Sequence, residues 1–229
     1  MIDSRILYED NHLIAINKLP GELSQGDRTG DSSIIDDVKD YLKRKYDKKG
    51  NVYLGLPHRL DRPTSGVILF AKTDKALSRL SDLFRKGEVE KNYYAVTLEE
   101  PRADEERLVN YIVRDEKRNI SVSYPREVRG SQKAILSYRL IDKSDRYYLL
   151  DVHLETGRHH QIRSQLKAIG LHIKGDLKYG APRSNRDGGI CLHSRRIAFI
   201  HPVRKEPIEI VAPLPDSDIW PVFKEKFDR

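Results

Sequence analysis

The chain has 229 residues, of which 38% are hydrophobic and 34% charged, and its formal net charge is +7. Its single cysteine, Cys191, excludes an internal disulfide framework and a cysteine-rich zinc site, and it fits a reducing compartment. No stretch approaches the roughly 18 apolar residues that span a bilayer, and residues 1–5 lack the apolar core of a signal peptide. We therefore expect a cytoplasmic protein with no membrane partner.

The apolar patterns predict short strands alternating with a few helices. In chain order, the expected strands cover 12–17, 67–71, 93–98, 135–140, 147–154, 197–200 and 208–211, and the expected helices cover 34–46, 74–85 and 160–168. Thr73 is placed to cap the second helix, and Gly87 follows its end. Successive strands with few helices predict an α+β fold with a mixed, mainly antiparallel sheet core, in a single domain over residues 1–229.

The positive charge is concentrated in one segment. Between Thr156 and Lys205 there are eleven Lys/Arg and two acidic residues, a net charge of +9, which leaves −2 for the rest of the chain. Such a concentration favours a polyanionic partner, above all nucleic acid. The plainer alternative is a set of separately solvated basic faces. A basic membrane-surface helix is disfavoured because glycines and a proline interrupt the segment.

The stretch from Pro57 to Gly66, PHRLDRPTSG, gathers charged side chains at the entry to an apolar strand. A loop residue there has a rigid support, a usual place for function. Arginines beside Asp61 favour its ionised form, so we expect this carboxylate to act as a nucleophile or an electrostatic partner. The alternative is an aspartate that caps a turn before Thr-Ser-Gly while its arginine neighbours point to solvent.

Two further stretches carry candidate groups. In LETGRHHQIR, over 154–163, Arg163 lies about one turn into a helix that begins near His159, so it can reach a site at the helix's amino end. A chelating histidine pair is normally four residues apart, whereas His159 and His160 are adjacent, so we expect no metal here. In the third stretch Tyr93 and Tyr94 face opposite sides of a strand. At most one of them lines a given site, and both could be ordinary half-buried strand residues.

Together these stretches resemble the RluA-type pseudouridine synthases, enzymes that isomerise uridine in ribosomal or transfer RNA. The motifs stand in the family's order: ILYED with Asn17-Lys18 over 6–18, HRLD with TSG over 58–66, KNYYA over 91–95, TGRHHQIR over 156–163, Gly175-Asp176 with Tyr179-Gly180, and Leu192-His193 with FIHP over 199–202. The resemblance extends from Ile6 to Val211 and implies the sheet core of that family.

The resemblance also implies roles for individual residues. Asp61 matches the essential aspartate, Tyr93 the tyrosine that contacts the target base, and Arg163 the basic residue paired with the aspartate. Arg59 matches an arginine that fills the gap left by an extruded uridine. The other residues expected to contact RNA are Arg62, Arg158, His160, Lys174, Arg195 and Arg196. No metal and no cofactor are expected, since the reaction exchanges no electron or group with another molecule.

The implied chemistry breaks the bond from ribose C1′ to base N1, turns the base, and rejoins it through C5. Asp61 would attack C1′ or base C6, and the sequence leaves both routes open. Tyr93 is within the repertoire of general bases that remove the C5 proton. The target base must be flipped out of its RNA structure, which gives Arg59 a physical use.

A non-catalytic RNA-binding or ribosome-assembly factor on the same scaffold is the alternative, but it need not keep Asp61, Tyr93 and Arg163 together. A hydrolytic metalloenzyme would need a ligand set that the sequence lacks. We expect a monomer that binds a stem-loop of 23S rRNA or tRNA, with no obligatory protein partner. Because the first motif begins at Ile6, the small N-terminal RNA-binding domain of many relatives is expected to be absent. The family's Lys-Pro-x-Gly reads Lys-Leu-Pro-Gly over 18–21, which puts the shape of that loop in doubt.

Overall fold

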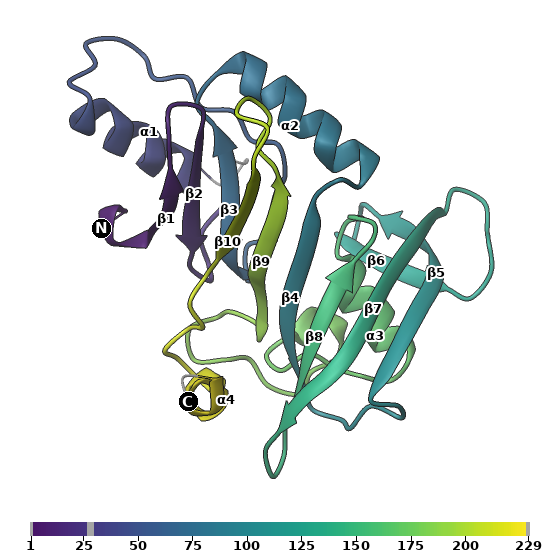
Figure 1. The fold of residues 1–229 in the computed structure, drawn as a ribbon. Coiled ribbons are helices and arrows are strands. Elements are labelled where there is room, and N and C mark those ends of the chain that lie inside the picture. The colour runs from purple at the N-terminus through teal and green to yellow at the C-terminus, as the bar shows by residue number, and fades with distance from the viewer. Residues whose placement is uncertain (1, 27–29, 228–229) are drawn as a thin grey trace. The chain divides into compact units, whose positions relative to one another are not determined.

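The computed structural model describes residues 2–26 and 30–227. The chain forms two compact units, Met1–Glu90 with Ser194–Pro213 and Lys91–His193 with Leu214–Arg229 (Figure 1). Among the described residues, no helix is long and apolar enough to cross a membrane.

The first unit is an antiparallel sheet with two helices. Its elements are the 3₁₀ helix Asp3–Arg5, β1 (Ile6–Glu9), β2 (Leu13–Lys18), α1 (Ile34–Lys45), β3 (Ser65–Ala71), α2 (Asp74–Lys86), most of β9 (Leu192–Ile200) and β10 (Pro207–Val211). The strand order is β1-β2-β3-β9, with β10 beside β9. The pairs β1·β2, β2·β3 and β9·β10 are antiparallel.

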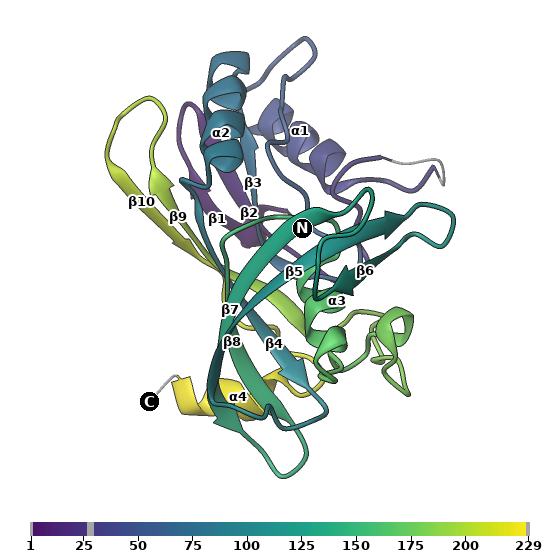
Figure 2. The same cartoon turned by 90° about the vertical axis from the view of Figure 1, so that its right-hand side faces the viewer.

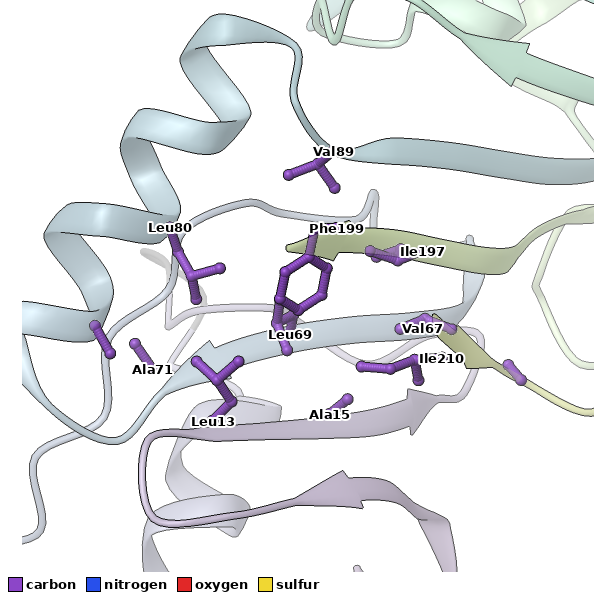
Figure 3. Packing of buried hydrophobic residues seen from close by; sticks show 12 residues of the cluster. Leu13, Ala15, Val67, Leu69, Ala71, Leu80, Val89, Ile197, Phe199 and Ile210 are labelled. Atoms are coloured by element: carbon purple, nitrogen blue, oxygen red, sulfur yellow. The ribbon is translucent and has the colours of Figure 1, made fainter. Parts of the chain in front are cut away.

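One hydrophobic core of this unit lies between α2 and the sheet. All seven residues of β3 are buried, and Phe199 packs among aliphatic side chains from β2, β3, β9, β10 and α2 (Figure 3). The helix begins where Thr73 Oγ1 accepts a hydrogen bond from Ala76 N at 3.2 Å, and it ends at Gly87, whose φ is +75°. Both ends agree with the prediction from sequence.

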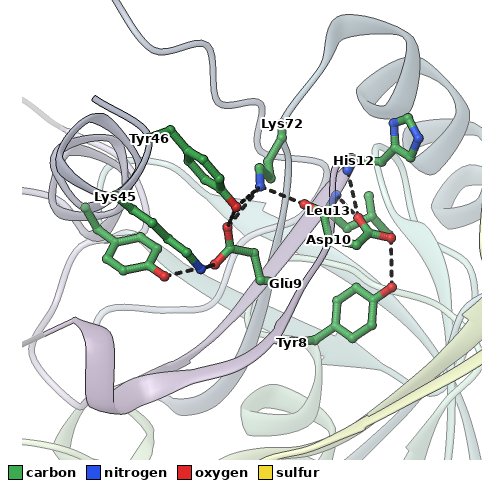
Figure 4. A network of polar contacts seen from close by, with 9 residues as sticks. Tyr8, Glu9, Asp10, His12, Leu13, Lys45, Tyr46 and Lys72 are labelled. Carbon is green, nitrogen blue, oxygen red and sulfur yellow. Dashed lines mark hydrogen bonds and ion pairs between the residues drawn. The ribbon is translucent and has the colours of Figure 1, made fainter. Parts of the chain in front are cut away.

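A buried carboxylate ties α1 to the sheet. Glu9 accepts hydrogen bonds from Tyr41, Lys45 and Tyr46 at the end of α1, and from Lys72 after β3 (Figure 4). Burial alone would raise the pKa of Glu9, but these four donors lower it to about 2. The carboxylate therefore stays ionised and holds the helix in place.

The second unit is a strongly twisted antiparallel sheet. Its elements are β4 (Glu90–Thr97), β5 (Glu105–Asp115), β6 (Ile120–Tyr124), β7 (Gln132–Lys143), β8 (Tyr148–Leu154), α3 (Gln161–Ala168), the 3₁₀ helix Leu177–Tyr179 and α4 (Trp220–Phe227). The strand order is β4-β8-β7-β5-β6, and all four neighbouring pairs are antiparallel. The helix α3 packs against β5 and β6 (Figure 2).

The α+β fold with mainly antiparallel pairing is confirmed, and so are the predicted helices, within a residue or two of their ends. The sequence patterns missed β1, the β5–β6 hairpin and α4. In β5 only Leu108 and Ile112 are buried, so the strand shows no regular alternation of apolar and polar residues. The prediction of one domain over the whole chain stays a prediction.

Candidate active site

Asp61 lies in the loop that leads into β3, and the main chain on both sides of it is fixed. On one side, the Ser24 hydroxyl donates to Leu60 O at 2.8 Å and accepts from Leu60 N at 3.2 Å. On the other, Thr64 N donates to Asp61 O at 3.0 Å. The side chain of Asp61 is half-buried. The loop can therefore hold a carboxylate in one position through its main chain.

The same loop is clamped by a buried lysine that sequence reasoning left without a role. The Lys18 ammonium is fully buried and donates to three main-chain carbonyls, those of Leu19 and Arg62 at 3.0 Å and of Thr64 at 2.7 Å. Burial lowers the pKa of Lys18 to about 8, although the charge of Asp61 works in the opposite direction. A positive charge thus lies in the electrostatic range of Asp61.

The two arginines that flank Asp61 are placed differently from this lysine. Arg62 ion-pairs with Asp31 at 2.8 Å and donates to Gly21 O at 2.9 Å. Its charge is balanced by Asp31 at the surface, whereas the sequence predicted that it would act on Asp61. Arg59 is exposed, as an arginine that enters RNA must be.

Gly66, at the end of this motif, is required by close packing. Its φ is +107°, and a Cβ at this position would lie 2.2 Å from the main-chain oxygen of Ser194. No other residue fits, because the obstacle is rigid backbone of β9. The glycine lets β3 and β9 lie close together. This close packing fixes the carboxyl end of the loop of Asp61.

Tyr93 lies on β4, in the second unit, and is 8% exposed. The strand alternates as predicted: Lys91, Tyr93 and Ala95 are buried, whereas Asn92 and Tyr94 are half-buried. Desolvation lowers the pKa of Lys91, which shares the face of Tyr93. Tyr94 faces the other side of the strand, where it packs against a core that includes Val96 and Trp220.

Arg163 lies in the first turn of α3 and is 4% exposed. Its Nε and one terminal nitrogen each lie 2.7 Å from an oxygen of Asp176, which makes a two-bond ion pair between buried groups. The Tyr179 ring lies 4.7 Å from the guanidinium carbon. Asp176 belongs to the Gly-Asp motif, for which the sequence predicted no role. Its pairing with Arg163 could not be predicted from the spacing of the two residues.

His160 belongs to the same cluster and is neutral. Ser121 N donates to the Tyr179 hydroxyl oxygen at 2.7 Å, and this hydroxyl forms a hydrogen bond with His160 Nδ1 at 2.9 Å. Desolvation and the charge of Arg163 lower the pKa of His160 to about 2. Any contact of His160 with RNA is therefore that of an uncharged ring.

Two of the cations expected to contact RNA are engaged with acidic residues of their own unit. Lys174 ion-pairs with Asp218, and Arg196 pairs with Glu90 at 2.9 Å and Glu209 at 2.7 Å. These pairs neutralise part of the positive charge of the segment from Thr156 to Lys205, for which we expect a polyanionic partner.

The remaining two predicted RNA contacts are Arg158 and Arg195. Arg158 is exposed at the turn before α3 and donates to Lys133 O at 3.1 Å. Arg195 is half-buried and donates to Ala212 O. Among residues 2–26 and 30–227, no three His, Cys, Asp or Glu side chains are grouped so that they could hold a metal ion.

Comparison with known proteins gives one consistent result. A family model described as RNA pseudouridylate synthase matches residues 12–168. The uncharacterized RNA pseudouridine synthase YlyB of Bacillus subtilis is 30% identical over 219 residues, covering 94% of this chain and 71% of the relative. The tRNA pseudouridine synthase C of Vibrio cholerae is 28% identical over 236 residues, covering 94% of this chain and 92% of the relative.

Among solved structures, human RNA pseudouridylate synthase domain containing 4 matches with a TM-score of 0.81 and 25% identity, over 98% of this chain and 94% of that one. The resemblance carried by the sequence motifs is confirmed. The chain therefore belongs to the RNA pseudouridylate synthase family, whose activity is the isomerisation of uridine in RNA to pseudouridine.

Proposed function

We propose that this pseudouridine synthase acts on a uridine of structured RNA, with a tRNA stem-loop as the first candidate and 23S rRNA as the second. The order follows the relatives, since several are named tRNA pseudouridine synthase C, including those of Vibrio cholerae and Salmonella typhi. Specificity for RNA rests on loops and splayed bases rather than on a short linear code, so a compact stem-loop suits this chain.

The observation that carries the mechanism is the support of Asp61, a half-buried carboxylate on a loop pinned through its main chain. Asp61 attacks the uridine at C1′ or C6, and the glycosidic bond to N1 breaks. The base turns and C5 bonds to C1′, which displaces Asp61 from C1′ on the first route; on the second route Asp61 is expelled from C6 as the C5 proton leaves. On both routes C5 loses its proton, N1 gains one, and Asp61 is regenerated. The buried Lys18 ammonium places a positive charge within electrostatic range of Asp61.

In this proposal Tyr93 contacts the base and accepts the C5 proton, and Arg163 supplies positive charge to the reacting centre. Arg59 occupies the space left by the flipped uridine. Arg62, Arg158, Lys174, Arg195 and Arg196 contact RNA, and His160 supports them as a neutral residue. The two units act as one catalytic domain in a monomer, and the single cysteine is consistent with the cytoplasm.

The test is tritium release from RNA labelled at uridine C5. The RNA comes from cells lacking this protein, in separate tRNA and 23S rRNA fractions, with no metal or cofactor added. We expect release by the wild type from one fraction, and none by Asp61→Asn. Asp37→Asn, an exposed change on α1, is the matched control and keeps full activity. Full release by Asp61→Asn overturns the assignment of Asp61. Tight binding of both fractions without release by the wild type favours a non-catalytic role.

A further inference from the structure

Residues 174–191 form a loop in the second unit that is closed at its base. Cys191 N donates to Lys174 O at 2.8 Å. Gly175, at the start, has a φ of +87°, and a Cβ there would lie 2.6 Å from the side chain of Asn185. Asn185 is buried, accepts from Lys174 Nζ at 2.9 Å and donates to Cys191 Sγ at 3.3 Å. The loop is thus folded back on its own ends, as in a compact Ω-loop.

The acidic residues near this loop are engaged in holding it. Asp187 accepts from Gly189 N at 2.9 Å and from Ser217 Oγ at 3.0 Å. Asp218 ion-pairs with Lys174. The three charges of Asp187, Asp218 and Lys174 therefore serve the shape of the loop.

Two cationic side chains of the loop differ from these three residues in their surroundings. Arg183 and Arg186 are exposed, and neither makes an ion pair with any residue in the described ranges. Both line a cavity of about 670 Å³, which is also lined by Lys174 and by the carboxylates of Asp187 and Asp218 described above. A cavity of this size accommodates a nucleotide-sized group.

We propose that this cavity, lined by Arg183 and Arg186, binds backbone phosphates of the substrate RNA outside the target uridine. The proposal rests on the proposed function, because it takes RNA as the substrate. Arginine presents a planar fork of donors that matches phosphate oxygens. The loop also begins next to Asp176, the residue that grips Arg163. One short segment therefore builds both the phosphate site and the support of the catalytic arginine.

The experiment compares Arg183→Gln/Arg186→Gln with wild type in filter binding to unfractionated tRNA over a range of salt. We expect binding to weaken about tenfold near 0.1 M salt, and the salt slope to fall by roughly one to two counterions, since two phosphate contacts are lost. Arg183→Lys/Arg186→Lys retains the charge and should recover most of the affinity. Lys43→Gln/Lys49→Gln, at exposed positions in and just after α1, removes the same charge and should leave the slope unchanged.

Equal losses in the two glutamine variants would show an effect of net charge only and overturn the site. An unchanged affinity of Arg183→Gln/Arg186→Gln would overturn it as well. Binding needs no turnover, so this readout is separate from tritium release. If the wild type binds tRNA through these arginines but releases no tritium, the loop site stands and the proposed catalytic function fails.

Discussion

The two stretches that carry the proposed catalytic charges are supported in different ways. The contacts that fix the loop of Asp61 go to its main chain, from the buried ammonium of Lys18 and the hydroxyl of Ser24. Around Arg163 they go to the side chain itself, where Asp176 takes two guanidinium donors.

The difference follows from what each group must do. A main chain that is held on both sides of a reactive carboxylate fixes where that carboxylate lies. An arginine has five donors, and it can share some with a second carboxylate while it still offers charge elsewhere. The three predictions below test this contrast.

The largest effect is expected for Asp176→Asn. The change keeps the shape of the side chain but removes the charge of Asp176 from its pair with the Arg163 guanidinium, and breaking a buried ion pair costs about 3–5 kcal/mol. Urea unfolding measures this loss, and tritium release should fall with it because the guanidinium is no longer held. Asp37→Asn is the control and should lie within about 0.5 kcal/mol of wild type. A stability equal to that of the wild type would show that the pair does not position Arg163.

A smaller effect is expected for Lys18→Met, which removes three charge-assisted hydrogen bonds, two of them to the loop of Asp61. We expect a loss of about 2 kcal/mol, partly offset because the lysine no longer has to be desolvated. Turnover should fall more than RNA affinity, since the Asp61 loop loses its clamp.

The matched control is Lys72→Met in the same unit. Lys72 is also largely buried, but it bonds Glu9 and the main chain of Asp10, away from the Asp61 loop (Figure 4). It should lower stability by a similar amount and leave turnover below the melting temperature unchanged. If both lysine variants lose turnover equally, backbone clamping of Asp61 is not the cause.

The smallest effect is a pH dependence. The pKa of His160 is lowered from 6.5 to about 2 in the folded protein, so between these values the unfolded chain binds the extra proton. The stability from this group is complete above pH 6.5 and is lost as pH falls, by about 1.4 kcal/mol per unit. His160→Asn removes the titration, and asparagine tolerates the φ of +50° found here.

The measurement is the free energy of unfolding of wild type and His160→Asn at pH 7.5 and pH 5. The difference between the two proteins should shift by roughly 2 kcal/mol in favour of the variant at the lower pH. A difference independent of pH would mean that His160 is not held neutral by its surroundings.

The amino-acid sequence by itself determined the local elements whose signals are contained in short windows. The cap at Thr73, the end at Gly87 and the alternation of Tyr93 and Tyr94 follow from neighbouring residues. The ordered motifs also identified the family and the loop of Asp61. The hairpin of β5 and β6 was not predicted, because its burial depends on α3, which lies far along the chain.

Only the tertiary structure decided which charged side chains pair with one another. Arg196 meets Glu90, 106 residues away, and so part of the basic segment is neutralised by partners that no window of sequence contains. The same holds for Asp176 at Arg163 and for Lys18 at the loop of Asp61. Charge is counted locally in a sequence, but ion pairing, desolvation and backbone support depend on residues that meet only when the chain folds.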